Sequence, residues 1–341
     1  MKVAPPPRTL APKTAPTVSV IEIRDPTAVG EGIEVIRQDA IQLTSKPLRA
    51  RRVAVRLGSC VLVFQSTNRP MRTRSVLRDG LAAFVTFGPR AAATVNGMPV
   101  GPGRILAGAA GIDAEFVVAA GYESVSFLVP PDEIRAHLAG RRRDDPCFIP
   151  QGVELLQAGP AAVSRLHQWG RRLADTAARR PEVFEVPQTK SAAQAELLEM
   201  LLEVLGPAAA VPFKSSHLTR RAHHRVVRIA EDYALAHIGE RLHVTGLCEA
   251  AAVSERTLQY AFKEVMGMTP VAFLTRLRLH RVRQALRAAT PRSATVTAQA
   301  MRWGFWHFGD FSRAYKRCFG ELPSDTLRRR HRLGEPLHSA T

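Results

Sequence analysis

Hydrophobic positions in the first part of the chain form short runs separated by turns. Between about residues 19 and 130 such runs recur at 53–64, 81–87, 115–120 and 124–130, and Gly and Pro punctuate them. Short apolar runs with regular turns are typical of a β-sandwich or a barrel. The pattern therefore predicts a β-rich domain at this end of the chain.

After residue 130 the spacing becomes helical. Pro131, followed by two acidic residues, suits the first turn of a helix. We interpret residues 151–180 and 190–205 as helical. The second range carries an i, i+3, i+4, i+7 stripe of Leu197, Leu198, Leu201, Leu202 and Leu205. Packing of this stripe within the chain and a dimer seam are both open.

The C-terminal region contains an internal repeat with an offset of 53 residues. The offset pairs Leu258 with Phe311, Phe262-Lys263 with Tyr315-Lys316, Gly267 with Gly320, and Pro270 with Pro323. Each copy reads as a helix, a tight turn and a second helix. The aromatic or leucine residues four apart mark the buried side of the second helix, and glycine can end it. Two short helices around such a turn predict a helix-turn-helix unit.

One long helix is predicted between the two units, over residues 270–289. At 1.5 Å per residue it would span about 27–30 Å, close to the roughly 34 Å turn of B-DNA. This length would place two recognition helices at successive major grooves.

These residues resemble the DNA-binding domain of AraC/XylS-type bacterial transcription regulators. The resemblance rests on SERTLQYAFKEVMGMTPVAFLTRLRLHRVRQAL (254–286) and WGFWHFGDFSRAYKRCFGELPSDTLRR (303–329). It covers about a third of the chain. Ala252 stands where the family usually has glycine, a change that we do not expect to threaten the fold. Family N-terminal domains are often cupin-like barrels that bind small effectors or mediate dimers, and the β-rich segment resembles them loosely.

The resemblance implies roles for exposed positions of both recognition helices. The predicted base contacts are Arg256, Gln259, Tyr260, His307, Asp310 and Arg313. The predicted phosphate contacts are Ser254, Lys263, Lys316, Arg317 and Arg328. Arginine can bind a guanine edge through two hydrogen bonds and glutamine can pair with adenine, whereas phosphate contacts position a protein without reading sequence. Tyr260 could instead belong to the core, and Arg313 could contact a phosphate. Trp303, Phe305, Phe311, Tyr315 and Phe319 are predicted to form a small core, and Trp306 and Phe308 are not assigned.

The charge of the chain favours a polyanionic partner. The net charge is +18 over 341 residues, and residues 217–341 hold 21 Lys plus Arg against 10 Asp plus Glu. A coding bias toward arginine would spread this excess more evenly. Nucleic acid is the expected partner.

Enzyme and metal chemistry find little support. The four cysteines lie far apart, no His precedes His137, and a metal-binding cupin needs two or three barrel histidines. His223 and His224 are interpreted as surface residues at a helix start. We predict no cofactor, no metal site and no enzymatic activity. A cupin-like metalloenzyme with an appended helical domain, and a non-specific architectural DNA binder, are the disfavoured alternatives.

The predicted fold class is α+β, with a β-rich cupin-like barrel and flanking helices followed by an all-α domain of two helix-turn-helix units joined by a long helix. The predicted organisation is a disordered Pro-rich tail (1–18), a sensor domain (19–135), a helical segment (136–207), a linker (208–216), the AraC-type domain (217–330) and a tail (331–341). The predicted partners are double-stranded promoter DNA, RNA polymerase, a small effector and a second copy of the chain, with activation favoured over repression. Neither a signal peptide nor a membrane span is expected, and the localisation predicted is cytoplasmic, at the nucleoid.

Overall fold

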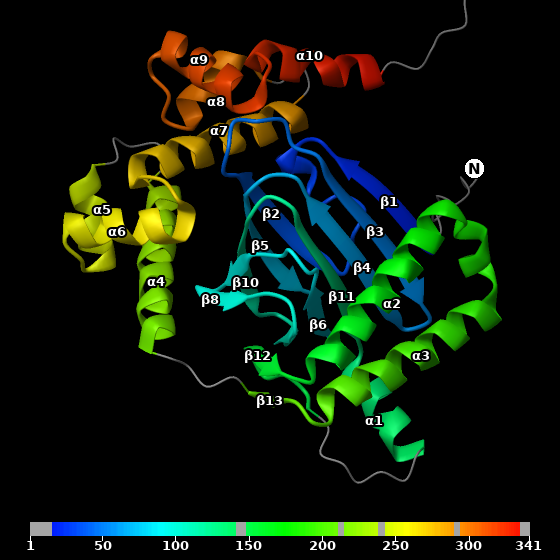
Figure 1. The fold of residues 1–341 in the computed structure, drawn as a ribbon. Coiled ribbons are helices and arrows are strands. Elements are labelled where there is room, and N and C mark those ends of the chain that lie inside the picture. The colour runs from blue at the N-terminus through cyan, green and yellow to red at the C-terminus, as the bar shows by residue number, and fades with distance from the viewer. Residues whose placement is uncertain (1–15, 141–147, 211–214, 238–242, 290–293, 335–341) are drawn as a thin grey trace, which may run out of the picture.

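The structure is a computed structural model, and it describes residues 16–140, 148–210, 215–237, 243–289 and 294–334. Two antiparallel sheets form its N-terminal part, and helices form its C-terminal part (Figure 1). The prediction of a β-rich domain followed by a helical one is therefore confirmed. The two sheets face one another as a sandwich, and their strands do not close into a barrel.

The larger sheet has the strand order β1-β3-β4-β11-β6-β9-β12-β13. Its strands are β1 (Val18–Ile23), β3 (Ala50–Leu57), β4 (Cys60–Thr67), β11 (Tyr122–Val129), β6 (Ala82–Phe87), β9 (Arg104–Gly108), β12 (Val153–Gln157) and β13 (Ala209–Ala210). The smaller sheet has the order β2-β5-β10-β7-β8, from β2 (Ile36–Gln42), β5 (Met71–Leu77), β10 (Asp113–Val118), β7 (Ala93–Val95) and β8 (Met98–Val100).

The helices are η1 (Pro26–Ala28), α1 (Pro131–Gly140), α2 (Pro160–Arg179), η2 (Pro181–Glu185), α3 (Pro187–Leu205), α4 (Ser215–Ala236), α5 (Val244–Ala251), α6 (Glu255–Met266), α7 (Pro270–Ala288), α8 (Val296–Arg302), α9 (Phe308–Phe319) and α10 (Pro323–Gly334). Helix α1 begins at Pro131, as predicted. The interpretation of residues 151–180 as helical is wrong for Val153–Gln157, which pairs with β9 over five residues. Backbone pairing with a strand far along the chain decides this segment, and local spacing does not reveal it. In the range 208–216, predicted as a linker, the structure describes β13 and the first residues of α4.

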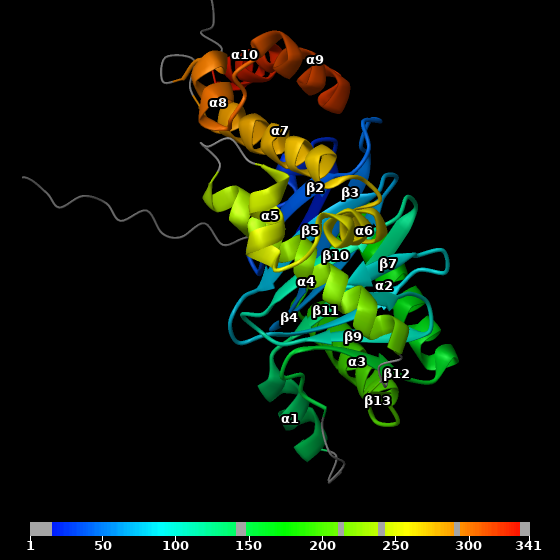
Figure 2. The same ribbon diagram turned by 90° about the vertical axis from the view of Figure 1, so that its left-hand side faces the viewer.

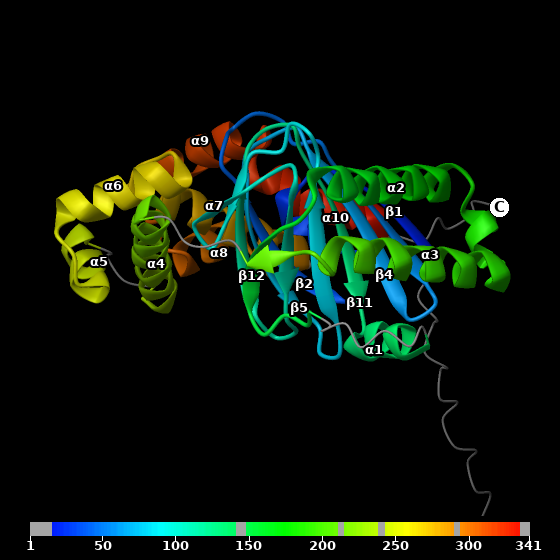
Figure 3. The same ribbon diagram turned by 60° about the horizontal axis from the view of Figure 1, so that its bottom comes forward.

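Helices α2 and α3 cover the outer face of the larger sheet (Figure 3). Leu197, Leu198, Leu201 and Leu205 are buried there, while Leu202 is partly buried. The leucine stripe thus packs within the chain. Phe64 and Phe84 also face this helical layer, whereas Phe87 lies in the core between the sheets.

Helix α4 covers the outer face of the smaller sheet, on the side opposite α2 and α3 (Figures 2 and 3). Ile41 of β2 is fully buried among residues of α4, α6 and α7. The sandwich and the C-terminal helices therefore share a hydrophobic core, and burial of Ile41 and Leu43 helps to hold the two parts together.

Candidate nucleic-acid interface

The first helix-turn-helix unit consists of α5 and α6, joined by residues 252–254. Ser254 is the N-cap of α6, and its Oγ accepts a hydrogen bond from the Thr257 N–H at 3.2 Å. Leu258 and Phe262 are fully buried on the inner side, as predicted. Gly267 ends α6 with φ at +71°, a conformation that favours glycine. Capping and termination fix the start and the end of this recognition helix.

The turn of the first unit contains Ala252 in the left-handed conformation, with φ at +52° and ψ at +44°. An L-residue with a Cβ pays roughly 1–2 kcal/mol in this conformation. The Val253 N–H donates to the Cys248 carbonyl at 3.0 Å, which helps to hold the turn. The turn thus keeps a conformation that glycine would adopt freely, at a local cost that the sequence did not reveal.

The second unit consists of α8 and α9. Thr295 is the N-cap of α8, accepting a hydrogen bond from the Ala298 N–H at 3.1 Å. Phe311 and Tyr315 are buried four residues apart on α9, and Gly320 ends that helix with φ at +77°. The second copy therefore repeats the buried pair and the terminal glycine of the first.

The aromatic residues of the second unit divide into core and surface. Trp303, Phe305 and Phe319 are partly buried and pack against the cluster that contains Phe311 and Tyr315, which confirms the predicted small core. Burial raises the pKa of Tyr315 to about 12, so its hydroxyl stays protonated and bonds to Thr326 Oγ1 at 2.8 Å.

The two aromatics that the sequence left unassigned are exposed. Trp306 is 52% exposed and Phe308 is 41% exposed. Phe308 is the first residue of α9, and Trp306 lies just before its N-cap, His307. They add apolar and stacking surface beside the predicted contact residues of this helix.

The outer face of α6 carries the residues predicted to read bases. Arg256 and Tyr260 are exposed, Gln259 is partly buried, and Lys263 is exposed one turn further along. Tyr260 is 56% exposed, so it does not belong to the core. Arg256 Nη2 donates to the Tyr260 hydroxyl at 3.3 Å, and its guanidinium lies 5.3 Å from the centre of that ring. The tyrosine restricts the arginine to one side of the helix.

The outer face of α9 is equally accessible. His307, Asp310, Arg313, Lys316 and Arg317 are all exposed. Arg313 and Asp310 form an ion pair with side chains that are 75% and 72% exposed. Exposed pairs of this kind contribute little to stability, so this pair holds neither side chain in place by a large free energy.

Ser254 and Arg328, both predicted to contact phosphate, already have partners. Ser254 caps α6, and Arg328 Nη2 lies 2.7 Å from Asp325 Oδ1 on the exposed side of α10. The contact roles of all these residues stay predictions. The neighbouring Arg329 and Arg330 lie outside the residues whose side chains are described.

Helix α7 contacts helices of both units (Figure 1). It also carries a row of arginines that face the N-terminal domain. Arg281 Nη2 lies 2.9 Å from Asp39 Oδ2, Arg283 Nε lies 2.7 Å from Asp25 Oδ2, and Arg287 Nη2 lies 3.1 Å from Glu31 Oε1. These arginines neutralise acidic residues of the N-terminal domain.

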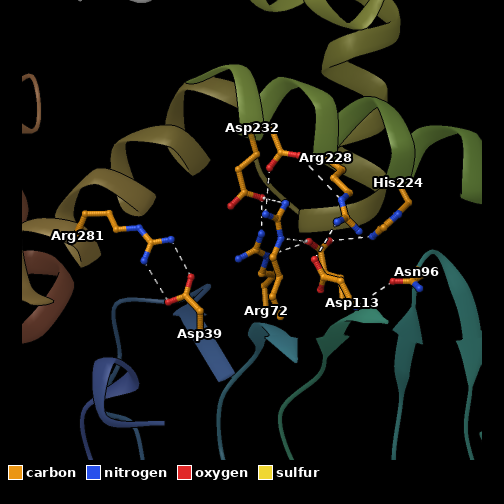
Figure 4. Close-up of polar contacts among 11 residues, drawn as sticks. Asp39, Arg72, Asn96, Asp113, His224, Arg228, Asp232 and Arg281 are labelled. Carbon is orange, nitrogen blue, oxygen red and sulfur yellow. Dashed lines mark hydrogen bonds and ion pairs between the residues drawn. The ribbon is translucent and has the colours of Figure 1, made fainter. Parts of the chain in front are cut away.

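An ionic network joins α4 to strands β5 and β10 (Figure 4). Arg72 is fully buried; its Nε lies 3.1 Å from Glu115 Oε2, and its Nη2 contacts Glu231 of α4. Arg74 Nε lies 3.1 Å from the same Glu115 oxygen, and its Nη2 lies 3.0 Å from Glu231. The buried Arg72 and the partly exposed Arg74 thus share the two buried carboxylates of Glu115 and Glu231 across the interface.

His224 belongs to this network, so the interpretation of His224 as a surface residue is wrong. It is 6% exposed, and its Nε2 lies 3.0 Å from Glu115 Oε1. Burial alone would raise the pKa of Glu115, but Arg72, His224 and Arg74 together hold it well below its usual value. The error arose because the histidine is buried only by a sheet more than 100 residues earlier in the chain.

No group of three or more His, Cys, Asp or Glu in the described part of the chain is arranged to hold a metal ion. Within those same ranges, no helix combines the length and the apolar character that crossing a membrane requires.

The C-terminal region of the chain is similar to known helix-turn-helix regulators. Residues 247–329 match a helix-turn-helix domain family. The probable thc operon regulatory protein of Rhodococcus erythropolis is 42% identical over 103 residues, which are 30% of this chain and 31% of that protein. The XylDLEGF operon transcriptional activator 3 of Pseudomonas putida is 37% identical over 106 residues, 31% of each chain. A probable AraC family transcriptional regulator from Rhodopseudomonas palustris, known from a crystal structure, is 38% identical and matches over 95% of its length and 30% of this chain, with a TM-score of 0.28.

Through its C-terminal domain, this chain belongs to the AraC family of transcriptional regulators. The matches agree with the prediction of a regulator rather than an enzyme. They cover about a third of the length of the curated relatives, so they describe the AraC-type domain and leave the role of the β-sandwich to be argued from its own residues.

Proposed function

We propose that this chain is a sequence-specific DNA-binding transcription regulator that reads two successive major grooves with α6 and α9. The observation that carries the proposal is the pair of helix-turn-helix units. Each has a recognition helix with a buried i, i+4 pair, a terminal glycine and an exposed polar face. Helix α7, with 19 residues, spans about 28 Å between the units, and B-DNA repeats its major groove about every 34 Å.

The exposed residues of each recognition helix fall into two groups, those that contact bases and those that contact phosphates. In the proposal, Arg256 binds a guanine edge, Gln259 binds adenine, and Tyr260 orients Arg256 while it packs on a base. Arg313, His307 and Asp310 form the corresponding set on α9. Lys263, Lys316 and Arg317 contact phosphates, with Ser254 and Arg328 at the margins.

Selection of binding sites from a random oligonucleotide pool, followed by fluorescence anisotropy, tests this proposal. The selected site should bind about 10³-fold or more tightly than random DNA of equal length at about 0.15 M salt. The logarithm of the affinity should fall linearly with the logarithm of the salt concentration because phosphate contacts release counterions. Equal affinity for both DNAs would leave only a non-specific binder.

Two variants separate reading from positioning. Arg256→Ala should relax the preference at one base position, with about 1–3 kcal/mol of discrimination lost there. Lys316→Ala should weaken all sequences alike and lower the salt slope by about one unit. The reverse pattern would overturn the assignment of these two residues.

We further propose that a small effector in the sandwich controls DNA binding. Strand β5 supports this because its side chains alternate between two faces. Thr73 and Ser75 line a cavity between the sheets, whereas Arg72 and Arg74 both bind the Glu231 carboxylate of α4. A change in the cavity can therefore act on the strand that holds the first helix of the C-terminal region.

The proposal also includes three further properties. The protein acts as a homodimer at promoters in the nucleoid, it contacts RNA polymerase, and it activates transcription. Support for activation comes from the P. putida relative, whose name describes a transcriptional activator. A reporter gene under a promoter that contains the selected site measures the sign of regulation, and sedimentation equilibrium measures the oligomeric state.

A further inference from the structure

The cavity between the two sheets has a volume of about 120 Å³. A water molecule needs about 10–15 Å³ of such space, so the cavity can hold a small organic molecule. Its lining is mostly apolar, with Val29, Leu106, Phe116 and Leu128 among the residues that contribute to it. An apolar cavity with a few polar groups is the usual form of a ligand site.

Arg52 of β3 lines this cavity and is only 2% exposed. Its Nη1 donates to the carbonyl oxygens of Val29 at 2.5 Å and Glu31 at 3.2 Å, and its Nη2 donates to Gln38 Oε1. Its Nε–H is buried and has no hydrogen-bond partner among the residues that the structure describes. The guanidinium is thus held in place by neutral groups, and Nε is its one nitrogen atom without a partner among the described residues.

Arg52 differs from the other deeply buried arginines in its lack of a counter-ion. Arg72 has Glu115 and Glu231, and Arg283 has Asp25 and Glu321. Among the described residues, no carboxylate oxygen forms an ion pair with Arg52. Burial without a counter-charge lowers the pKa of Arg52 to about 10, so the side chain stays charged at neutral pH. A buried charge of this kind is costly until an opposite charge joins it.

Further polar side chains lie beside Arg52 on the inner face of the sandwich. Arg52 pairs in register with Gln65 of β4, and Gln65 pairs with Ser124 of β11. On the facing sheet, Gln38 donates to Ser75 Oγ at 3.0 Å. All five residues line the cavity. The polar groups therefore form one band across the cavity. Among the described lining residues, the charged side chains are Arg52, which belongs to this band, and Arg51, which is ion-paired.

We infer that this cavity binds a small organic acid, with its carboxylate on Arg52 and the polar band and its apolar body against the surrounding side chains. The single unpaired cation selects a monoanion, and the apolar walls select a hydrocarbon body. The inference rests on the proposed function only in calling this acid the effector; binding itself does not depend on DNA.

The test uses the full chain without DNA and two pairs of probes. Hexanoate and cyclohexanecarboxylate are compared with hexanamide and cyclohexanecarboxamide by isothermal titration calorimetry and by thermal shift. Each acid should bind about 10- to 100-fold more tightly than its amide, because hydrogen bonds to a charged group contribute about 1.5–3 kcal/mol. Equal binding of acid and amide, or no binding of either acid, would overturn the inference.

Arg52→Met should abolish the preference for the acids, and Arg51→Met is its matched control. Arg51 is the residue before Arg52 on β3; it borders the cavity, but its guanidinium pairs with Asp175 of α2, with 3.4 Å between Nη1 and Oδ1. The control should retain the preference. If Arg52→Met does not fold by circular dichroism, the acid-to-amide ratio of the unmodified chain still decides. Sequence-specific DNA binding is measured separately, so failure of either proposal is distinguishable from failure of the other.

Discussion

Substitution of Glu115 by glutamine tests how the β-sandwich and α4 are held together. Its Oε2 lies 3.1 Å from both Arg72 Nε and Arg74 Nε, and the glutamate and Arg72 side chains are fully buried. At an effective dielectric constant of about 20, a pair at this separation gains roughly 5 kcal/mol, before the cost of removing the charges from water. Breaking a buried pair by removing one partner typically costs about 3–5 kcal/mol. Glu115→Gln should therefore lower the free energy of unfolding by about 3 kcal/mol or more.

Asp113→Asn is the matched control, since Asp113 faces the same way on β10. It pairs with Arg228 at 2.8 Å, but the two side chains are 27% and 36% exposed. Its loss should cost about 0.2–1 kcal/mol, as for partly solvated pairs. Urea denaturation followed by circular dichroism measures both variants. A cost for Glu115→Gln no larger than that for Asp113→Asn would refute the reasoning about the buried network.

The pH dependence of Glu115 gives a second readout of the same network. Because the folded pKa is lowered, its stabilisation is fully present above the unfolded value of about 4.3 and is lost as pH falls below it. Glu115→Gln should therefore lose less stability than the unmodified chain between about pH 4.5 and 3. Parallel curves over that range would count against a charged Glu115 in the folded state.

Three further predictions concern single positions. Ala252→Gly should stabilise the chain by about 0.5–1 kcal/mol in urea denaturation, because it relieves the left-handed conformation while it adds entropy to the unfolded state; a destabilisation would contradict this. Gly97→Ala should destabilise the chain by about 1–3 kcal/mol in the same assay. A Cβ at this position would lie 2.8 Å from the Arg220 carbonyl oxygen of α4, in a turn with φ at +76°. An unchanged unfolding midpoint would show that α4 shifts to accommodate the methyl group. Burial lowers the pKa of His280 to about 3. The free energy of unfolding should therefore keep its full value above the unfolded pKa of about 6.5 and fall by about 1.4 kcal/mol per pH unit below it. His280→Leu should flatten the dependence of thermal stability on pH between pH 6.5 and 5, and an unchanged slope would exclude His280 as the source of that dependence.

The sequence predicted the helix-turn-helix units well because their determinants are local. The buried pairs, Leu258 with Phe262 and Phe311 with Tyr315, follow from helical spacing, and the repeat supplies each unit with an independent check. Caps and terminal glycines are likewise local signals. The sequence does not reveal the conformational cost of Ala252. That cost depends on the sign of φ at this position, which only the structure gives.

The network between the domains could not be predicted in the same way. Arg72 and Arg74 look like solvated residues of a β-strand until Glu115 and Glu231 are placed beside them, and these lie 43 and 159 residues from Arg72 in sequence. The sequence does contain one sign of buried charge, namely charged residues next to apolar runs. Glu115 begins the run EFVVAA, and Arg52 directly precedes the run VAVRLG. Such residues are seldom fully buried without partners, so each marks a position where a partner should be sought.

Repeated site selection with Arg256→Ala and with Arg313→Ala tests the central claim most directly. If α6 and α9 read successive major grooves, each variant should lose base preference at its own group of positions, and the two groups should be centred about 10–10.5 base pairs apart. If both variants instead weaken every sequence equally and leave all preferences unchanged, the two helices do not read DNA as proposed.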